Sequence, residues 1–91
     1  MCGIFSCLYS THSIDYYQSC HESIKHRGPD HSVLEQHGNH VLGFHRLSIN
    51  DLSDKGNQPL CLDHMKLICN GEIYNHEELK RIGWIFCVCI T

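Results

Sequence analysis

The sequence has no long hydrophobic run and no strongly basic segment. Its longest apolar stretch, residues 84–90, is far shorter than the roughly 20 residues that span a bilayer. The first six residues, Met-Cys-Gly-Ile-Phe-Ser, carry neither a basic segment nor a long apolar one, so no secretory signal is visible. The seven lysines and arginines are scattered, and no basic stripe favours nucleic acid. We therefore expect a cytoplasmic chain with no membrane and no nucleic acid among its partners.

Internal repeats, low-complexity segments and interdomain linkers are also missing. The 91 residues indicate one domain or part of one. Apolar residues make up 42% of the chain and charged residues 19%, which is typical of a globular segment rather than a disordered one. A chain of this length buries only about two-thirds of its extended surface, so its core is small.

Cysteine and histidine are abundant, with seven and nine copies. The odd cysteine count and the absence of a secretory signal favour a reducing compartment over a disulfide framework. We expect the histidines to be exposed loop residues, and His45 is the first to examine because it precedes Arg46. A zinc site is an alternative, although its spacing is not that of a standard finger. Its candidate ligands are Cys61, His64, Cys69, Cys87 and Cys89.

The periodicity of apolar residues predicts an α+β fold. A turn at residues 37–40 should close a hairpin, and Asn75 followed by Glu78 resembles a capping box. The loop at residues 26–30 should end the first helix, because it contains Gly28 and Pro29. Strands are expected over residues 2–9, 32–36, 41–47, 60–62 and 65–69, and helices over residues 15–25 and about 76–81.

Cys2 has a chemical property that other cysteines lack. The initiator Met1 is normally removed before so small a residue, which leaves a thiol and a free α-amine on Cys2. Such amines titrate at about 7.7–8.0 in unperturbed peptides, so near neutral pH a share of them can accept a proton. A nucleophile beside its own N-terminal amine is a known form of activation. The alternative is a buried cysteine after an ordinary initiator methionine.

Four further residues could complete a site for attack on an amide. Arg46 has a planar fork that can hold a carboxylate through two parallel hydrogen bonds. Asn70 offers a side-chain N–H donor and Gly71 an unobstructed backbone N–H, and two such donors can stabilise an oxyanion. Glu72 could bind an ammonium group. Taken separately, Arg46 could equally be a surface strand residue, and Asn70-Gly71 an ordinary turn.

Five longer sequence motifs follow one another along the chain: Met1-Cys2-Gly3-Ile4-Phe5, His26-Arg27-Gly28-Pro29-Asp30, Gly43-Phe44-His45-Arg46-Leu47-Ser48-Ile49, Gln58-Pro59-Leu60 and Asn70-Gly71-Glu72-Ile73-Tyr74-Asn75-His76. Together they resemble the N-terminal part of the glutamine-hydrolysing asparagine synthetases, which are class II glutamine amidotransferases. The resemblance covers residues 1–80, about the first half of the family's glutaminase domain. Residues 81–91 form an apolar tail that does not match.

The resemblance implies a truncated αββα sandwich of the N-terminal-nucleophile type and L-glutamine as the substrate. Cys2 would be the nucleophile, with its α-amine as the base, and would form a γ-glutamyl thioester. Asn70 and Gly71 would line the oxyanion hole. The glutamine would be held by Arg46, by the backbone of Leu47, Ser48, Ile49 and Asn50, and by Glu72.

Two features of the family have no counterpart after Lys80. One is a second acidic residue that contacts the glutamine ammonium group, and the other is the phosphate loop of the synthetase domain. The expectation is a truncated product or gene fragment that holds no cofactor, because ATP and magnesium belong to the missing domain. A separate synthetase chain or a homodimer would be its protein partner. Two rivals stay open: a non-catalytic remnant or binding module that keeps the motifs, and a small zinc module.

Overall fold

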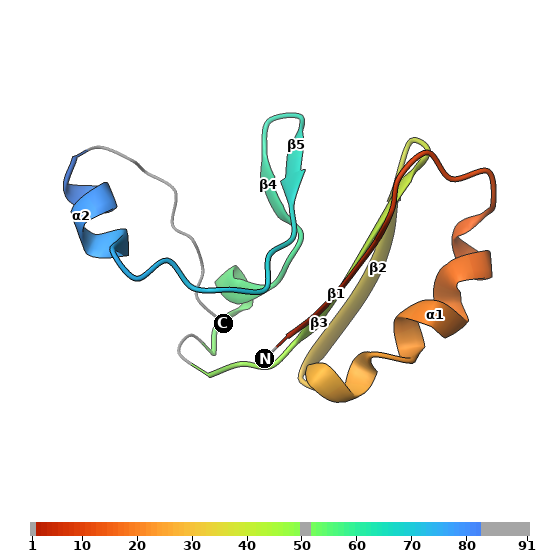
Figure 1. The fold of residues 1–91 in the computed structure, drawn as a ribbon, viewed down its shortest axis with the longest axis horizontal. Helices are drawn as coiled ribbons and strands as arrows, with labels where there is room; N and C mark the ends of the chain where they lie inside the picture. Colours follow the sequence, from red (N-terminus) through yellow and green to blue (C-terminus); the bar gives the residue numbers. More distant parts are fainter. Residues whose placement is uncertain (1, 50–51, 83–91) are drawn as a thin grey trace.

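A three-stranded antiparallel sheet forms the larger part of the fold (Figure 1). The computed structural model describes residues 2–49 and 52–82. The sheet has the order β1-β3-β2, with strands β1 (Gly3–Cys7), β2 (His31–His37) and β3 (His40–Arg46). The predicted hairpin is confirmed. Its turn uses Gly38 at φ 63°, the conformation that two-residue hairpin loops require.

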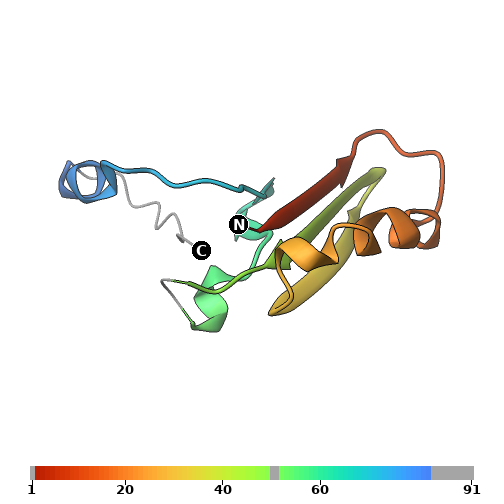
Figure 2. The ribbon, with the colours of Figure 1, turned by 60° about the horizontal axis from the view of Figure 1, so that its bottom comes forward.

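One face of this sheet is covered by a helical layer (Figure 2). The layer consists of η1 (Ile14–Tyr17), α1 (Gln18–Glu22) and η2 (Lys25–Arg27). The expected continuous helix over residues 15–25 is therefore wrong, because only one short α-helical segment lies between two 3₁₀ turns. The segment is rich in Tyr, Ser, Cys and His, which have modest helix propensity, and Ser13 makes no side-chain cap.

Side chains of β1 and β3 alternate between the two faces of the sheet. A Cβ added to Gly43 would lie 2.6 Å from Cδ2 of His21, so the odd-numbered residues of β3 face the helical layer. Phe5 faces the same layer, since its ring centroid lies 6.0 Å from that of Tyr17. Paired residues of an antiparallel sheet project to the same side, and Ile4 pairs with Phe44. The even-numbered residues of both strands therefore share the face away from α1.

Two histidines lie in the core rather than in exposed loops, which corrects the expectation from the sequence. His21 is 2% exposed and His45 is fully buried. Their rings stack with centroids 3.8 Å apart. Nε2 of His45 lies 2.7 Å from the carbonyl oxygen of His21, so it carries the proton and donates. The hydroxyl of Ser32, 2.7 Å from Nδ1, then donates to the other ring nitrogen.

The stability of the fold should fall in mild acid because of His21. Burial, and then the neighbouring His45, lower the pKa of His21 below its usual value. The unfolded chain therefore binds more protons than the folded one just below pH 6.5, and stability decreases as the pH falls through that value. The slope for one proton is at most about 1.4 kcal/mol per pH unit. Urea unfolding at pH 7.5 and 5.5 measures it. His21→Phe should show a smaller loss, whereas an equal loss in both proteins would contradict this assignment.

The loop at residues 26–30 packs directly against the end of β3. Gly28 is buried there, and a Cβ added to it would lie 2.1 Å from the carbonyl oxygen of His45. The backbone N–H of Asp30 donates to the carbonyl oxygen of Arg46 at 2.9 Å. Glycine at position 28 is therefore what permits this contact.

Gly28→Ala should destabilise the chain by about 3 kcal/mol or more, because the clash is with backbone that cannot swing away. Urea unfolding monitored by circular dichroism measures the change. Gly71→Ala is the matched control, since its Cβ would meet only Sγ of Cys69 at an ordinary 3.8 Å. Equal stability of the two variants would show that the loop does not pack as described.

The second part of the fold is a two-stranded hairpin followed by a short helix (Figure 1). A 3₁₀ turn, η3 (Asp54–Gly56), precedes it. The hairpin consists of β4 (Leu60–Leu62) and β5 (Met65–Leu67), and the helix is α2 (His76–Arg81). The hairpin lies on the side of the main sheet away from α1. The radius of gyration, 14.0 Å, exceeds the roughly 12 Å of a compact domain of this length.

Two details of this part differ from the expectation. The second hairpin strand ends at Leu67 rather than at Cys69. The helix begins at His76 as predicted, with Asn75 at its N-cap, but the Asn75 side chain makes no capping hydrogen bond, so the capping box does not form. Of the tail at residues 81–91, residues 83–91 lie outside the described residues. Among the residues that the structure describes, no helix is long and apolar enough to cross a membrane.

Candidate active site

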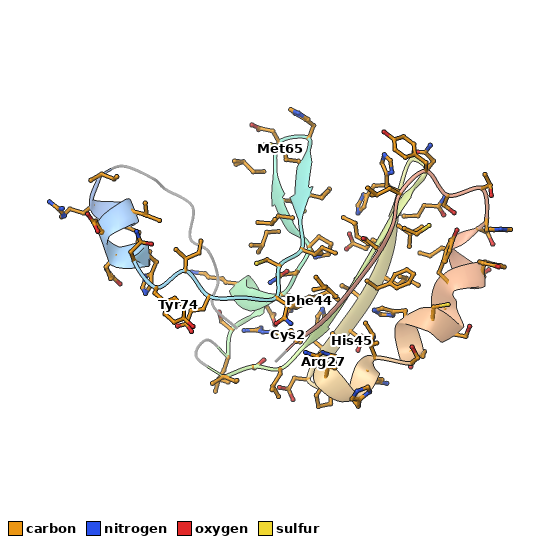
Figure 3. All side chains as sticks on the ribbon, in the orientation of Figure 1. Cys2, Arg27, Phe44, His45, Met65 and Tyr74 are labelled. Carbon is orange, nitrogen blue, oxygen red and sulfur yellow. The ribbon has the colours of Figure 1, made fainter. Side chains whose placement is uncertain are left out.

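Cys2 lies at the start of β1, opposite the end of β3. Gly3 pairs with His45, so the register places Cys2 beside Arg46, and both side chains share the face away from α1. Cys2 is fully buried. Its Sγ accepts a hydrogen bond from the backbone N–H of Leu47 at 3.2 Å. Figure 3 shows Cys2, Arg27 and His45 together near this end of the sheet.

The loop at residues 26–30 holds the Cys2 backbone and the chain after β3. Nε of Arg27 donates to the carbonyl oxygen of Cys2 at 3.4 Å. Oδ2 of Asp30 accepts a hydrogen bond from the backbone N–H of Ser48 at 2.8 Å. The resemblance implied that residues 26–30 are the loop that packs over the nucleophile, with a plain helix-ending loop as the alternative, but it assigned no role to these two side chains. Their roles could have been suspected, because both residues belong to the sequence motif His26-Arg27-Gly28-Pro29-Asp30.

Arg46 is 2% exposed, so it is not a surface strand residue. Its Nη1 donates to the carbonyl oxygen of Ser53 at 2.6 Å and to Oδ1 of Asn57 at 2.9 Å. The guanidinium thus holds the loop that leads from β3 to the hairpin. The sequence did not reveal this role of Arg46.

Gln58 connects this loop to the segment after β5. The side chain is 4% exposed. Its Oε1 accepts from the backbone N–H of Cys69 at 2.6 Å, and its Nε2 donates to the carbonyl oxygen of Cys69 at 3.1 Å. Both backbone groups of Cys69 are therefore unavailable for strand pairing with β4, which explains why β5 ends before Cys69. Asn70 follows directly and is positioned by this pair of hydrogen bonds.

The structure brings some of the predicted site residues together and leaves others apart. Leu47 is hydrogen-bonded to the Cys2 sulfur, and Ser48 follows it directly, with its own N–H bound to Asp30. Asn70 is half-buried and connects to Arg46 through Asn57, Gln58 and Cys69. Exposed positions are found for Ile49, Gly71 and Glu72. Asn50 lies outside the described residues.

The zinc alternative finds no support in the part of the chain that the structure describes. No group of three or more His, Cys, Asp or Glu side chains there could hold a metal ion. The five described cysteines are all free. Cys87 and Cys89, two of the candidate ligands, lie outside the described residues.

Comparison with known proteins identifies the family. A family model described as a glutamine amidotransferase domain matches residues 1–82. The chain therefore belongs to the glutamine amidotransferase family. This finding agrees with the motif words on which the resemblance was based, since those words lie within the matched residues.

Curated relatives are similar to the chain over a shorter range. A nodule asparagine synthetase (glutamine-hydrolysing) of Pisum sativum is 52% identical over 60 residues, which cover 64% of this chain and 10% of that protein. Asparagine synthetase 1 of Lotus japonicus and an asparagine synthetase of Asparagus officinalis show the same identity and coverage. The predicted resemblance to the N-terminal glutaminase part of these enzymes is confirmed. The chain matches about a tenth of the length of these relatives, and no solved structure matches it.

Proposed function

We propose that this chain carries the glutamine-hydrolysing centre of an asparagine synthetase-like protein, with Cys2 as the nucleophile and L-glutamine as the substrate. The observation that supports it most is the placement of Cys2 opposite Arg46 on the sheet face away from α1. In Figure 1 the hairpin and the chain that follows β5 lie on this side of the sheet. Membership of the glutamine amidotransferase family supports the substrate.

The reaction begins once Met1 is removed and the α-amine of Cys2 is free. The amine accepts the thiol proton, and Sγ attacks the carboxamide carbon of glutamine. The N–H groups of Asn70 and Gly71 stabilise the oxyanion that forms. The carbon–nitrogen bond then breaks, and ammonia leaves with a proton from the amine. Water hydrolyses the γ-glutamyl thioester to glutamate and restores the thiol.

Substrate binding is assigned to the groups around Arg46. Its guanidinium is positively charged, and the glutamine α-carboxylate is a fitting partner for it. Backbone from Leu47 to Asn50 and the carboxylate of Glu72 complete this part of the proposal. Because Nη1 of Arg46 already holds Ser53 and Asn57, the carboxylate must approach the guanidinium alongside those contacts.

We propose that residues 1–80 form the first half of an αββα sandwich of the N-terminal-nucleophile type. One helical layer against one sheet, with the start of a second sheet on the other side, is consistent with it. In the intact family the ammonia would pass to aspartate in a synthetase domain that uses ATP and magnesium. A separate synthetase chain or a homodimer, and a cytoplasmic location, belong to the same proposal.

Glutamate release from glutamine tests the function directly, with intact mass measured on the same sample. Hydrolysis is expected only from molecules that have lost Met1. A version with one extra serine between Met1 and Cys2 is the matched control, because it keeps the thiol and moves the free amine to another residue. Equal hydrolysis by both versions would exclude the α-amine as the base.

The burial of Cys2 favours a second candidate, a remnant that binds glutamine without turnover. At 0% exposure, the sulfur is reached only if the surrounding chain moves. Equilibrium dialysis with labelled glutamine separates the two functions. Binding without glutamate release would establish the second candidate, and binding with release the first.

A further inference from the structure

The β4–β5 hairpin has two chemically different faces. Leu60 pairs with Leu67 and Leu62 with Met65, so these four apolar side chains share one face. Cys61 pairs with Lys66 on the other face. The apolar alternation thus leaves a thiol and an amine as direct neighbours across the two strands.

The sulfur of Cys61 contacts the ammonium group of Lys66 on the surface. Nζ of Lys66 donates to Sγ of Cys61 at 3.0 Å, and Cys61 is exposed. This hydrogen bond is the main reason that the pKa of Lys66 is raised, and the charge of Glu35 adds to it. Lys66 is therefore cationic at neutral pH. A cation beside a thiol stabilises negative charge on sulfur, and the anionic form is the one that reacts.

The other described cysteines lack this combination. Cys2 is buried, and Cys7 and Cys69 are half-buried. Cys20 is exposed on α1, but within residues 2–49 and 52–82 no lysine or arginine donates to its sulfur. Cys20 is therefore an internal reference with similar access to solvent and without the ammonium group.

We propose that Cys61 is a modification site at which this chain reacts with small disulfides, of which oxidised glutathione is an example, and that Lys66 activates it. In the reaction, Sγ of Cys61 attacks one sulfur of the disulfide. A new sulfur–sulfur bond forms while the original one breaks. Cys61 becomes a mixed disulfide, and half of the reagent is reduced and leaves as a thiolate that takes a proton from water.

The site is independent of the glutamine chemistry proposed for Cys2. It lies on the hairpin, on the face opposite the four leucine and methionine side chains, and shares none of the residues assigned to glutamine. A mixed disulfide there adds a polar, charged group without displacing apolar contacts. The modification is therefore compatible with the fold as described.

The test uses the full chain with Cys87→Ser and Cys89→Ser, so that those thiols cannot exchange with Cys61. The reduced protein is mixed with oxidised glutathione at pH 7.5 and quenched with acid at intervals. Mass spectrometry of peptides then gives the occupancy at each cysteine. Cys61 should react about 5-fold faster than Cys20 or more, as expected for a thiol beside a cation.

Variants at Lys66 separate activation from simple exposure. Lys66→Gln and Lys66→Ala should lower the reaction rate of Cys61 to within about 2-fold of the rate of Cys20. Lys66→Arg keeps the positive charge and should leave the rate of Cys61 high. Lys80→Ala, at an exposed lysine of α2, is the matched control and should leave the rate unchanged. Equal reaction rates of Cys61 and Cys20, or a Cys61 rate that is unchanged by Lys66→Gln and Lys66→Ala, would overturn the proposal.

Discussion

Cys2→Ala should reduce glutamine hydrolysis by at least about a thousandfold, because no covalent intermediate can form without the thiol. The substitution removes only Sγ, whose described hydrogen bonds are with the backbone N–H and carbonyl oxygen of Leu47. Glutamate release measured on freshly purified protein gives the rate. Circular dichroism shows whether the variant remains folded.

Two controls make this result specific. Cys20→Ala removes an exposed thiol on α1 and should leave the rate unchanged. Cys2→Ser keeps the α-amine and replaces the thiol with a weaker nucleophile, so it should lose most of the activity as well. Retention of the rate by Cys2→Ala would place the nucleophile elsewhere or reveal a contaminating glutaminase.

Asn70→Ala should lower kcat by about 10²–10³-fold, the usual loss when one oxyanion donor is removed. The effect should fall on kcat more than on KM, since the oxyanion exists only in the transition state and intermediate. Glutamate release over a range of glutamine concentrations separates the two constants. The half-buried position of Asn70, after the residue that Gln58 holds, is the structural basis.

Asn75→Ala is the matched control for this measurement. Asn75 lies in the same segment, and its side chain makes no capping hydrogen bond to α2, so its loss should affect neither constant. If Asn70→Ala behaves like Asn75→Ala, Asn70 takes no part in the reaction. If Asn70→Ala also unfolds the chain at a lower urea concentration, its role is structural instead.

The strands of the main sheet could be located from the sequence because the signals there are local. Alternating side chains and a glycine turn define β2 and β3, and each predicted bound of these two strands differs from the observed one by a single residue. The start of α2 was found for the same reason. The interruption around α1 was missed because periodicity does not distinguish one helix from short helical turns.

The structural features that the sequence did not predict depend on contacts between residues far apart in the chain. The early end of β5 depends on the Gln58 amide, which takes the backbone groups of Cys69 across 11 residues. The burial of His21 depends on the space above Gly43 and on stacking against His45. Neither contact leaves a periodic signal in the sequence.

The candidate site was also predictable only in part: its residues could be found from the sequence, but their contacts could not. Motif words identified Cys2, Arg46 and Asn70, and the order of strands then placed the first two on one face. The hydrogen-bond partners of Cys2 and Arg46 could not be assigned from the sequence, because they come from the loop at residues 26–30, from the residue after β3 and from the loop at residues 52–58. Asp30 and Gln58 act through backbone groups, and no spacing rule connects them to Cys2.

Labelling with a glutamine analogue that carries a diazo-ketone tests the central claim most directly. The reagent places an electrophilic carbon where the carboxamide carbon of glutamine would lie, and peptide mass spectrometry identifies each cysteine that reacts. The account predicts modification of Cys2 in molecules that lack Met1, prevented by excess glutamine and absent in Cys2→Ala. Equal labelling of Cys20, the exposed thiol with no neighbouring ammonium group among the described residues, or labelling of Cys2 that glutamine does not prevent, would contradict it.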